Sequence, residues 1–383
     1  MAKSIERISD RLLFTPGPLT TSLSVKKAML EDAGSWHFDF NAMVAELRER
    51  VLGVAGVKRE DGFECVLMQG SGTFGVESVF STVIPEGGRL LIVNNGAYGD
   101  RMIQMAEALR IEWESIDLAE NVPVTAAMIE ERMAAHPFSH VAVVHCETTS
   151  GILNPIERLG ETIRKHGADY IVDAMSSFGA LPINLIDGKI DYLISSPNKC
   201  LESVPGFCMV IGRREKLLAN QGKARCLSLD LAKQLLNFEK KGQFRYTPPT
   251  HTLLAFREAL DEFDSEGGMV AREKRYRGNH AALISGMKSL GFRPYLDSHI
   301  QSPIITSFYY PKAERFEFER FYRALSAEGL VIYPGKLTET ECFRIGSIGR
   351  LFPSDMRRLV ASIQYVLTDM GVETPLCCRH DSD

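Results

Sequence analysis

The sequence predicts an α/β fold, with a large domain built on a mostly parallel sheet flanked by helices and a smaller α+β domain after it. Three observations support this prediction. Short apolar runs alternate with longer amphipathic segments along the first two thirds of the chain. These runs mostly lack period-two alternation, which is typical of parallel strands buried on both faces. After about residue 265 the order of elements changes, at a Gly-Gly pair before a long helical pattern.

The predicted strands of the large domain are rich in Val, Ile and Leu, and they occupy residues 65–70, 89–96, 140–147, 170–175 and 192–196. Between them, segments 100–110 and 157–167 carry apolar residues three and four positions apart, which is typical of amphipathic helices. Strands that alternate with helices indicate a parallel sheet with crossover helices.

The smaller domain is predicted to open with a long helix after residue 265. A strand at 302–310, a helix within 316–330, two strands at 331–335 and 342–347, and a final helix from Ser354 follow. We found no internal repeat and no low-complexity segment, so solenoids and linkered arrays are excluded.

Composition excludes several classes of protein. The 383 residues are 45% hydrophobic and 24% charged, unlike a disordered, collagen-like or coiled-coil chain. No run of about 18 apolar residues is present that could span a membrane. The net charge of −5 and the lack of a Lys/Arg cluster argue against a nucleic-acid partner. Small-molecule chemistry is therefore the expected function.

A cytoplasmic location is expected, because the first ten residues include acidic side chains and no apolar run of signal-peptide length. The eight cysteines are scattered and none is spaced as Cys-x-x-Cys, so we expect reduced thiols and no metal site. The pair Cys377–Cys378 lies in a polar C-terminal segment that is expected to be a frayed terminus.

The first candidate site is a glycine-rich turn after the first strand of the large domain. Ser71, Gly72 and Thr73 lead into an apparent helix, whose free N–H groups and dipole favour a phosphate. The turn is neither a Walker sequence nor Gly-x-Gly-x-x-Gly, and a merely structural strand-to-helix turn is an open alternative.

Two further candidates follow strands. Asp173 ends the run Tyr-Ile-Val-Asp, where it could cap a helix or hold a proton on a ring nitrogen. Lys199 follows the strand at 192–196, and a desolvated amine there could attack a carbonyl, although a lone lysine on a loop is usually structural. Together the turn, the acid and the amine are the groups that pyridoxal 5′-phosphate requires: a phosphate anchor, a pyridinium partner and a Schiff-base amine.

Nearly the whole chain resembles the class V aminotransferases of the fold-type I superfamily, which use pyridoxal phosphate. The segments that carry the resemblance are LLFTPGPLTTS (12–22), QGSGTFGVES, NNGAYGDR, HCETTSGILNPI, DAMSSFGALPI, SSPNKCLESVPGF, YTPPTHTLLAFREAL and CFRIGSIGRLFPSDM (342–356). The resemblance implies a large domain at 21–265, a small domain at 266–370, an N-terminal arm at 1–20 that packs with the small domain, and a frayed tail at 371–383.

The resemblance also implies roles for individual residues. Lys199 resembles the Schiff-base lysine, Asp173 the partner of the pyridine nitrogen, and Ser71, Gly72 and Thr73 the phosphate cradle. Tyr98 resembles an aromatic that stacks on the cofactor ring, Thr148 a hydroxyl near the ring's 3-oxygen, and Arg344 the small-domain arginine that grips the substrate's acid group. Thr250 and Tyr246 resemble groups that a neighbouring subunit lends to the phosphate, which implies a homodimer with sites at the subunit interface.

Within the class, TPGPLTTS, GSW, CETTSGILNP and NKC with VPGF resemble the branch that moves the amino group of 2-aminoethylphosphonate to pyruvate, giving phosphonoacetaldehyde and alanine in a reversible ping-pong reaction. Ala33, His37 and the pair Glu202-Ser203 depart from that pattern. Two alternatives stay open: another class V aminotransferase, of the alanine–glyoxylate or serine–pyruvate type or acting on a modified aminophosphonate, and a silent cofactor-binding protein, which would not need both Lys199 and Asp173.

Overall fold

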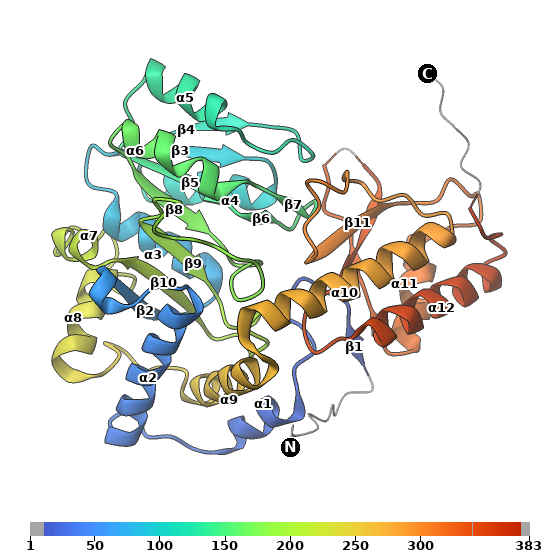
Figure 1. Cartoon of the computed structure of the whole chain (residues 1–383), viewed down its shortest axis with the longest axis horizontal. Helices are drawn as coiled ribbons and strands as arrows, with labels where there is room; N and C mark the ends of the chain where they lie inside the picture. The colour runs from blue at the N-terminus through green and yellow to red at the C-terminus, as the bar shows by residue number, and fades with distance from the viewer. Residues whose placement is uncertain (1–10, 339, 377–383) are drawn as a thin grey trace.

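The computed structural model describes residues 11–338 and 340–376. Its centre is a seven-stranded sheet in the order β2-β10-β9-β8-β5-β3-β4 (Figure 1). The bounds are β2 Phe63–Gln69, β3 Arg89–Asn94, β4 Glu112–Asp117, β5 His140–Val144, β8 Asp169–Asp173, β9 Tyr192–Ser195 and β10 Phe207–Arg213. Only β10 runs antiparallel to its neighbours in this sheet, so the predicted mostly parallel sheet is confirmed.

Helices flank the central sheet. α3 contacts α4, α7 and α8, whereas α6 packs on β8 and contacts α5. The bounds are α2 Phe38–Val54, α3 Gly72–Val83, α4 Ala97–Ala108, α5 Ala126–Ala135, α6 Gly160–Lys165, α7 Arg214–Ala219 and α8 Leu231–Lys241. Except for the edge strand β4, the strands between these layers are mostly buried, and their side chains form one core with the inward faces of the helices. Burial on both faces explains why the strands read as continuous apolar runs.

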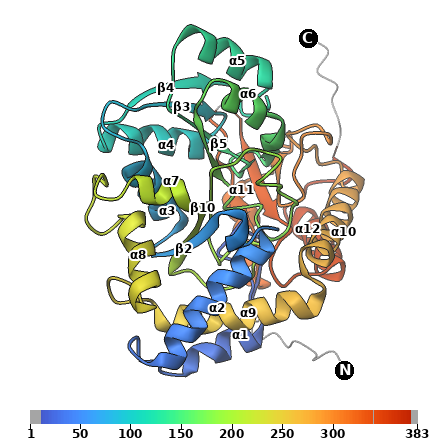
Figure 2. The ribbon, with the colours of Figure 1, turned by 60° about the vertical axis from the view of Figure 1, so that its left-hand side comes forward.

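A second, smaller core lies beside the first. The long helix α10 (Gly268–Ser289) packs on α12 (Pro353–Asp369), and both flank a three-stranded sheet of β11 (Ile305–Tyr309), β14 (Cys342–Gly346) and β13 (Tyr333–Pro334). α11 (Phe318–Ala327) completes this unit (Figure 1). α9 (Thr250–Glu266) connects the large unit to α10. α2 packs beside α9 (Figure 2).

The chain before the large unit crosses to the smaller core. β1 (Leu12–Leu13) pairs in parallel with β12 (Leu330–Val331), and Phe14 is fully buried among the side chains of the smaller core. The short helices α1 (Leu23–Lys27) and η1 (Ala28–Leu30) then contact α9. The remaining short elements are η2 Arg59–Asp61, β6 Cys146–Glu147, β7 Ile152–Leu153 and η3 Ile156–Arg158.

The sequence analysis did not predict two strands of the central sheet. β4 is an edge strand with charged residues, and β10 follows the loop after Lys199 and returns antiparallel between β2 and β9. The segment 140–147 was expected to be one strand, but it divides into β5 and β6. The segment 157–167 divides into η3 and α6.

The expected frayed tail from residue 371 is wrong for its first part. Val372 is buried in the smaller core, and the backbone N–H of Leu376 donates to the carbonyl of Leu290. Val372 and Leu376 therefore hold this segment on the smaller core, close to the end of α10. Residues 377–383, including Cys377 and Cys378, lie outside the described residues. No helix in the described part of the chain has the length and apolar content to cross a membrane.

Candidate active site

Most of the candidate residues lie at one edge of the central sheet. Asp173 is the last residue of β8, and it stands opposite Ile194 of β9 in the parallel register. Lys199 follows β9, Tyr98 lies in the first turn of α4 after β3, and Thr148 follows β6. Because the carboxyl ends of parallel strands meet at one edge, the sheet brings these segments together.

Asp173 is a buried carboxyl group. Its Oδ1 atom accepts a hydrogen bond of 2.9 Å from the N–H of Met175. Burial raises the pKa of Asp173 to about 6, Glu147 adds to this, and the positive charges of Lys199 and Arg101 oppose it. Among the described residues no cationic side chain forms a salt bridge with Asp173, so the carboxyl is suited to a cation that the chain itself does not provide.

Lys199 is held from the N-terminal segment. Its Nζ donates to the carbonyl oxygen of Pro16 at 2.9 Å, and the oxygen of Gly17 lies 3.4 Å away. Burial lowers the pKa of Lys199 to about 8, partly opposed by the charge of Asp173. Asp173 and Lys199 are thus close enough that each charge shifts the pKa of the other.

Gly17 lies against the same lysine. A Cβ atom on Gly17 would lie 2.5 Å from Cδ of Lys199, and its φ of +106° also favours glycine. The segment at residues 15–18 is therefore packed against the side chain of Lys199.

The glycine-rich turn forms the start of α3. Ser71 is the N-cap residue of α3 and has an extended backbone. Its hydroxyl does not accept a hydrogen bond from the first N–H groups of the helix. A Cβ on Gly72 would lie 2.3 Å from the sulfur of Met175, so glycine lets the turn approach the residues after Asp173. The hydroxyl of Thr73 accepts from Nη1 of Arg101 at 3.2 Å. The turn therefore combines a helix N-terminus, hydroxyls and a guanidinium, which suits a phosphate.

Tyr98 lies near two cationic groups. Its ring centroid is 4.9 Å from Cζ of Arg101 and 4.6 Å from Nζ of Lys336. Below it, the buried carboxyl of Glu147 accepts from the backbone N–H of Tyr98 at 3.1 Å and from the hydroxyl of Thr149 at 2.7 Å. Burial raises the pKa of Glu147, and these hydrogen bonds oppose the shift. Glu147 thus holds the backbone of the first turn of α4 at Tyr98.

Arg344 reaches the site from the smaller core. It lies in β14, and its Nη1 donates to the carbonyl of Thr148 at 2.8 Å while Nε donates to the carbonyl of Pro334 at 3.0 Å. The Thr148 side chain is buried at the same point. Arg344 and Thr148 are nearly two hundred positions apart in the chain, and the packing of the two cores brings them together.

Tyr246 and Thr250 are not brought into this group within one chain. Tyr246 is exposed, and its carbonyl accepts from Nε2 of Gln69 at 2.9 Å. Thr250 begins α9, with its hydroxyl 3.5 Å from Nδ1 of His251. No interaction among the described residues links either side chain to Lys199 or Asp173.

In the pair Glu202-Ser203, which departs from the pattern of the resembled branch, both residues are buried and Glu202 belongs to a buried ion cluster. Oε1 of Glu202 accepts from Arg275 and from the hydroxyl of Tyr276, each at 2.6 Å. Arg272, which is fully buried, bonds to Glu266 at 2.8 Å. Burial alone would raise the pKa of Glu202, but the charges of Arg272 and Arg275 outweigh it and the pKa is lowered. The cluster ties the loop after Lys199 to α10. His37, in contrast, is an exposed N-cap of α2.

Sequence reasoning missed Arg101, Glu147, Lys336 and Pro16. The first, second and last lie within the quoted motifs NNGAYGDR, HCETTSGILNPI and LLFTPGPLTTS, but no spacing rule singles them out. Lys336 follows the predicted strand at 331–335 and gave no signal of its own. Each reaches the site through contacts between distant segments.

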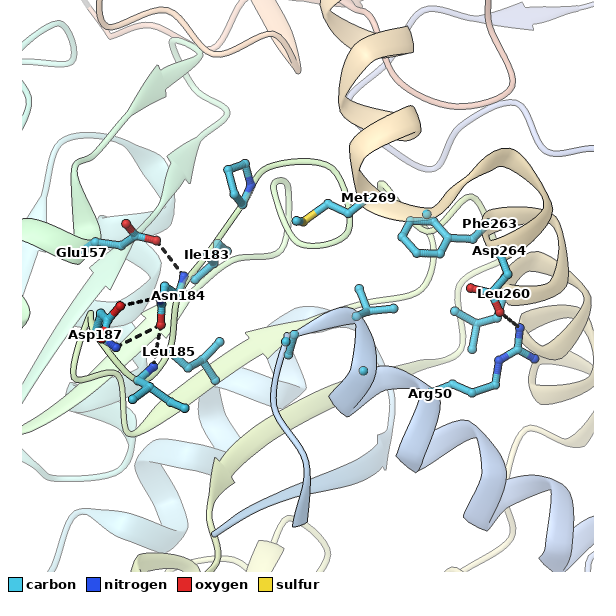
Figure 3. Close-up of a pocket in the computed structure, with 17 residues that line it drawn as sticks. Arg50, Glu157, Ile183, Asn184, Leu185, Asp187, Leu260, Phe263, Asp264 and Met269 are labelled. Carbon is cyan, nitrogen blue, oxygen red and sulfur yellow. Dashed lines mark hydrogen bonds and ion pairs between the residues drawn. The ribbon is translucent and has the colours of Figure 1, made fainter. Parts of the chain in front are cut away.

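A separate surface hollow of about 940 Å³ lies between the end of α2, the 182–187 loop and the α9–α10 junction (Figure 3). None of the candidate residues lines it. Its polar groups are already paired, since Arg50 bonds to Asp264 at 2.7 Å and the N–H of Asn184 bonds to Glu157 at 2.7 Å. The hollow is therefore separate from the candidate residues at the edge of the sheet.

The fold and the edge of the sheet together define a class of enzyme: an α/β transferase with a buried amine and a buried carboxyl in one site. The sequence pattern of the family described as "Aminotransferase class-V" matches residues 25–343. The chain therefore belongs to the class V aminotransferases, and the resemblance seen in the sequence is confirmed.

The chain is also similar in sequence to individual enzymes. The chain is 49% identical to the 2-aminoethylphosphonate–pyruvate transaminase of Klebsiella pneumoniae, over 92% of this chain and 96% of that protein. It is 44% identical to the enzyme of the same name from Pseudomonas aeruginosa, over 94% and 97%. The corresponding protein of Bacillus cereus is 49% identical, over 92% and 96%.

Solved structures share the fold. A ureidoglycine–glyoxylate aminotransferase from Bacillus subtilis superposes with a TM-score of 0.87 at 23% identity, over 95% of this chain and 94% of that chain. An alanine–glyoxylate aminotransferase from Nostoc sp. gives 0.87 at 24% identity, over 96% and 97%. At these identities the likeness concerns the fold alone, and it agrees with the predicted fold class.

Proposed function

We propose that this class V aminotransferase transfers the amino group of 2-aminoethylphosphonate to pyruvate, with pyridoxal 5′-phosphate as its cofactor. The observation that carries the proposal is the convergence of Lys199, Asp173 and Arg344 from separate elements on one edge of the sheet. The choice of substrate is supported by the relatives at 44–49% identity, whose names state these two compounds.

The donor groups of the site fit this cofactor. Asp173 is buried without a cationic partner of its own, which suits a protonated ring nitrogen. The N-terminus of α3 with Ser71, Gly72 and Thr73, together with Arg101, suits the phosphate. When bound, pyridoxal phosphate supplies an aldehyde that condenses with amines and a ring that accepts electrons from the substrate carbon.

Each side chain has a defined task in this proposal. Lys199, whose pKa is lowered to about 8, would hold the cofactor through its amine and would carry the proton to and from the substrate carbon. Asp173 would keep a proton on the ring nitrogen. Tyr98 offers a flat face, held by the bond from its N–H to Glu147, and Thr148 offers its hydroxyl. Arg344 binds the acid group of the substrate through two parallel hydrogen bonds.

The proposal includes a homodimer that shares its sites. Leu30, Trp36 and Phe38 are large apolar side chains exposed in one stretch of the chain, with exposed fractions of 83%, 79% and 74%. Apolar surface of this kind supports contact with a second subunit. Tyr246 and Thr250, which contact neither Lys199 nor Asp173 within the chain, are proposed to reach the phosphate of the neighbouring subunit.

The proposed location is the cytoplasm. The six cysteines that the structure describes are unpaired, and five of them are buried. Unpaired buried thiols fit a reducing compartment.

A panel of amino donors tests the reaction. Purified protein loaded with pyridoxal phosphate is incubated with pyruvate and 2-aminoethylphosphonate, or with glyoxylate and alanine or serine, and the products are quantified. We expect alanine and phosphonoacetaldehyde to form fastest from the phosphonate. Good turnover of serine or alanine with none of 2-aminoethylphosphonate would eliminate the proposed substrate and favour another class V activity.

A further inference from the structure

The hairpin of β13 and β14 carries two cationic side chains toward the large unit. Tyr333 of β13 stands opposite Arg344 of β14 in the antiparallel register. Gly335 follows β13 and lies close to the first residue of β14, because a Cβ atom on Gly335 would lie 2.2 Å from the carbonyl oxygen of Cys342. Lys336 is the next residue, so this close approach holds its backbone beside the strand that carries Arg344.

Lys336 faces the candidate site. Its Nζ lies 4.6 Å from the ring centroid of Tyr98, the residue proposed to stack on the cofactor. The loop after Lys336 is anchored to the large unit, because the N–H of Thr338 donates to Oε2 of Glu120 at 3.4 Å. Lys336 thus extends from the smaller core to Tyr98 of the large unit.

Several positive charges lie near one another at this place. Burial and the charges of Arg101 and Arg344 lower the pKa of Lys336, while Glu147 and Asp100 oppose the shift. Within residues 11–338 and 340–376, no carboxylate lies within salt-bridge distance of Lys336 or of Arg344. Like charges held together repel one another, and an anion bound between them would relieve that repulsion.

The geometry of the acid group decides how many donors it needs. A phosphonate has three oxygens and carries up to two negative charges, whereas a carboxylate has two oxygens and one charge. The planar fork of Arg344 can bond two oxygens at once, which satisfies a carboxylate and leaves one phosphonate oxygen and one charge.

We propose that Lys336 is a specificity residue for the amino donor, binding the third phosphonate oxygen beside Arg344. The inference rests on the proposed function and goes beyond it, because it assigns the selection of a phosphonate over a carboxylate to a residue outside every motif of the resemblance. Lys336 contributes little to pyruvate or alanine, whose carboxylate is fully bonded by Arg344.

The test measures each half-reaction by itself in single-turnover experiments with the cofactor-loaded protein. The change in cofactor absorbance is followed against the concentration of 2-aminoethylphosphonate or of L-alanine, for the wild type, Lys336→Met, Lys336→Arg and the control Lys288→Met. Lys288 is an exposed lysine in the last turn of α10.

For Lys336→Met we expect the apparent dissociation constant for 2-aminoethylphosphonate to rise about tenfold or more, as when a charged hydrogen bond is lost, with alanine unchanged within about twofold. Lys336→Arg restores most of the affinity, and Lys288→Met matches the wild type. Equal weakening for both donors, or no weakening, would overturn the inference alone. A wild type that does not react with 2-aminoethylphosphonate would instead overturn the proposed function, and this inference with it.

Discussion

The Nη1 atom of Arg344 lies 2.8 Å from the carbonyl oxygen of Thr148, and this bond joins the sheet of the smaller core to the loop after β6. A second bond, from Nε to the carbonyl of Pro334, holds the guanidinium from the other side. In the described part of the chain the Nη2 atom has no hydrogen-bond partner. The arginine is thus fixed by backbone oxygens and keeps donors available for a substrate.

Replacing Arg344 by lysine tests this arrangement. The variant keeps the charge but loses the fork and the two backbone bonds, so we expect kcat/KM for the acidic substrates to fall by about one to three powers of ten. Steady-state kinetics with 2-aminoethylphosphonate and with pyruvate measure the change. Arg323→Lys, on the exposed face of α11, is the matched control. Undiminished catalysis would remove Arg344 from the site.

Replacing Lys199 by alanine tests the reactive amine. We expect the long-wavelength absorbance band of the cofactor-loaded protein to disappear and kcat to fall by about a thousandfold or more, because no amine remains to bind the aldehyde or move the proton. The fold should persist, since burying a charged amine is itself unfavourable. Circular dichroism checks this, and Lys240→Ala, in the last turn of α8, is the control. A variant with an unaltered spectrum would mean that the amine is misassigned.

The buried carboxyl of Asp173 predicts a pH-dependent stability of the cofactor-free protein. Its pKa of about 6 when folded exceeds the ordinary value of 3.8, so the unfolded chain loses this proton first as the pH rises. The resulting loss of stability is absent well below pH 3.8, grows through the window from 3.8 to 6, and is complete above it.

Asp173→Asn should therefore gain stability relative to the wild type as the pH rises from 4 to 7, on the order of 2–3 kcal/mol at most. Urea unfolding at several pH values measures this difference. With pyridoxal phosphate added at pH 7, the wild type should be more stable than Asp173→Asn, because the protonated ring nitrogen of the cofactor then pairs with the carboxylate. A difference between the two proteins that does not vary with pH would contradict the assignment.

The cluster around Glu202 predicts a large stability effect. Glu202→Ala leaves Arg275 and the hydroxyl of Tyr276 without their buried acceptor, so we expect the free energy of unfolding to fall by about 3–5 kcal/mol. Glu202→Gln should lose less, because an amide oxygen can still accept. Denaturant unfolding measures both, with Glu86→Ala on an exposed turn as control, expected within about 0.5 kcal/mol of the wild type. A loss for Glu202→Ala as small as that of the control would show that the cluster contributes no net stability.

Subunit mixing tests the proposed sharing of sites. Lys199→Ala and Thr250→Asp should each be nearly inactive, the second because a carboxylate beside the cofactor phosphate repels it. If Thr250 comes from the neighbouring subunit, a dimer with one chain of each variant has one site in which both Lys199 and Thr250 are wild type. Activity should therefore reappear after the two proteins are unfolded and refolded together. Each variant refolded alone is the control. Mixed dimers as inactive as the parents would place Lys199 and Thr250 in the same subunit's site.

Much of the fold could be predicted because its causes are local. Most strands are buried on both faces, so their apolar runs stand out, and the glycines at positions 70 and 72 are needed where a strand turns into a helix. β4 and β10 were missed for physical reasons. β4 is a charged edge strand, and β10 pairs antiparallel between β2 and β9, a choice that depends on partners elsewhere in the chain.

The sequence by itself determined the α/β class, the family, and the likeness of Lys199, Asp173 and Arg344 to known functional residues. Tertiary structure alone decided that Pro16 receives the Lys199 amine, that Glu147 holds Tyr98, and that Lys336 stands beside Arg344. The reason is that apolar periodicity reports a residue's own strand or helix. Charges and hydrogen-bond partners converge only when segments far apart in the chain pack together, and no pattern in one segment records where another will lie.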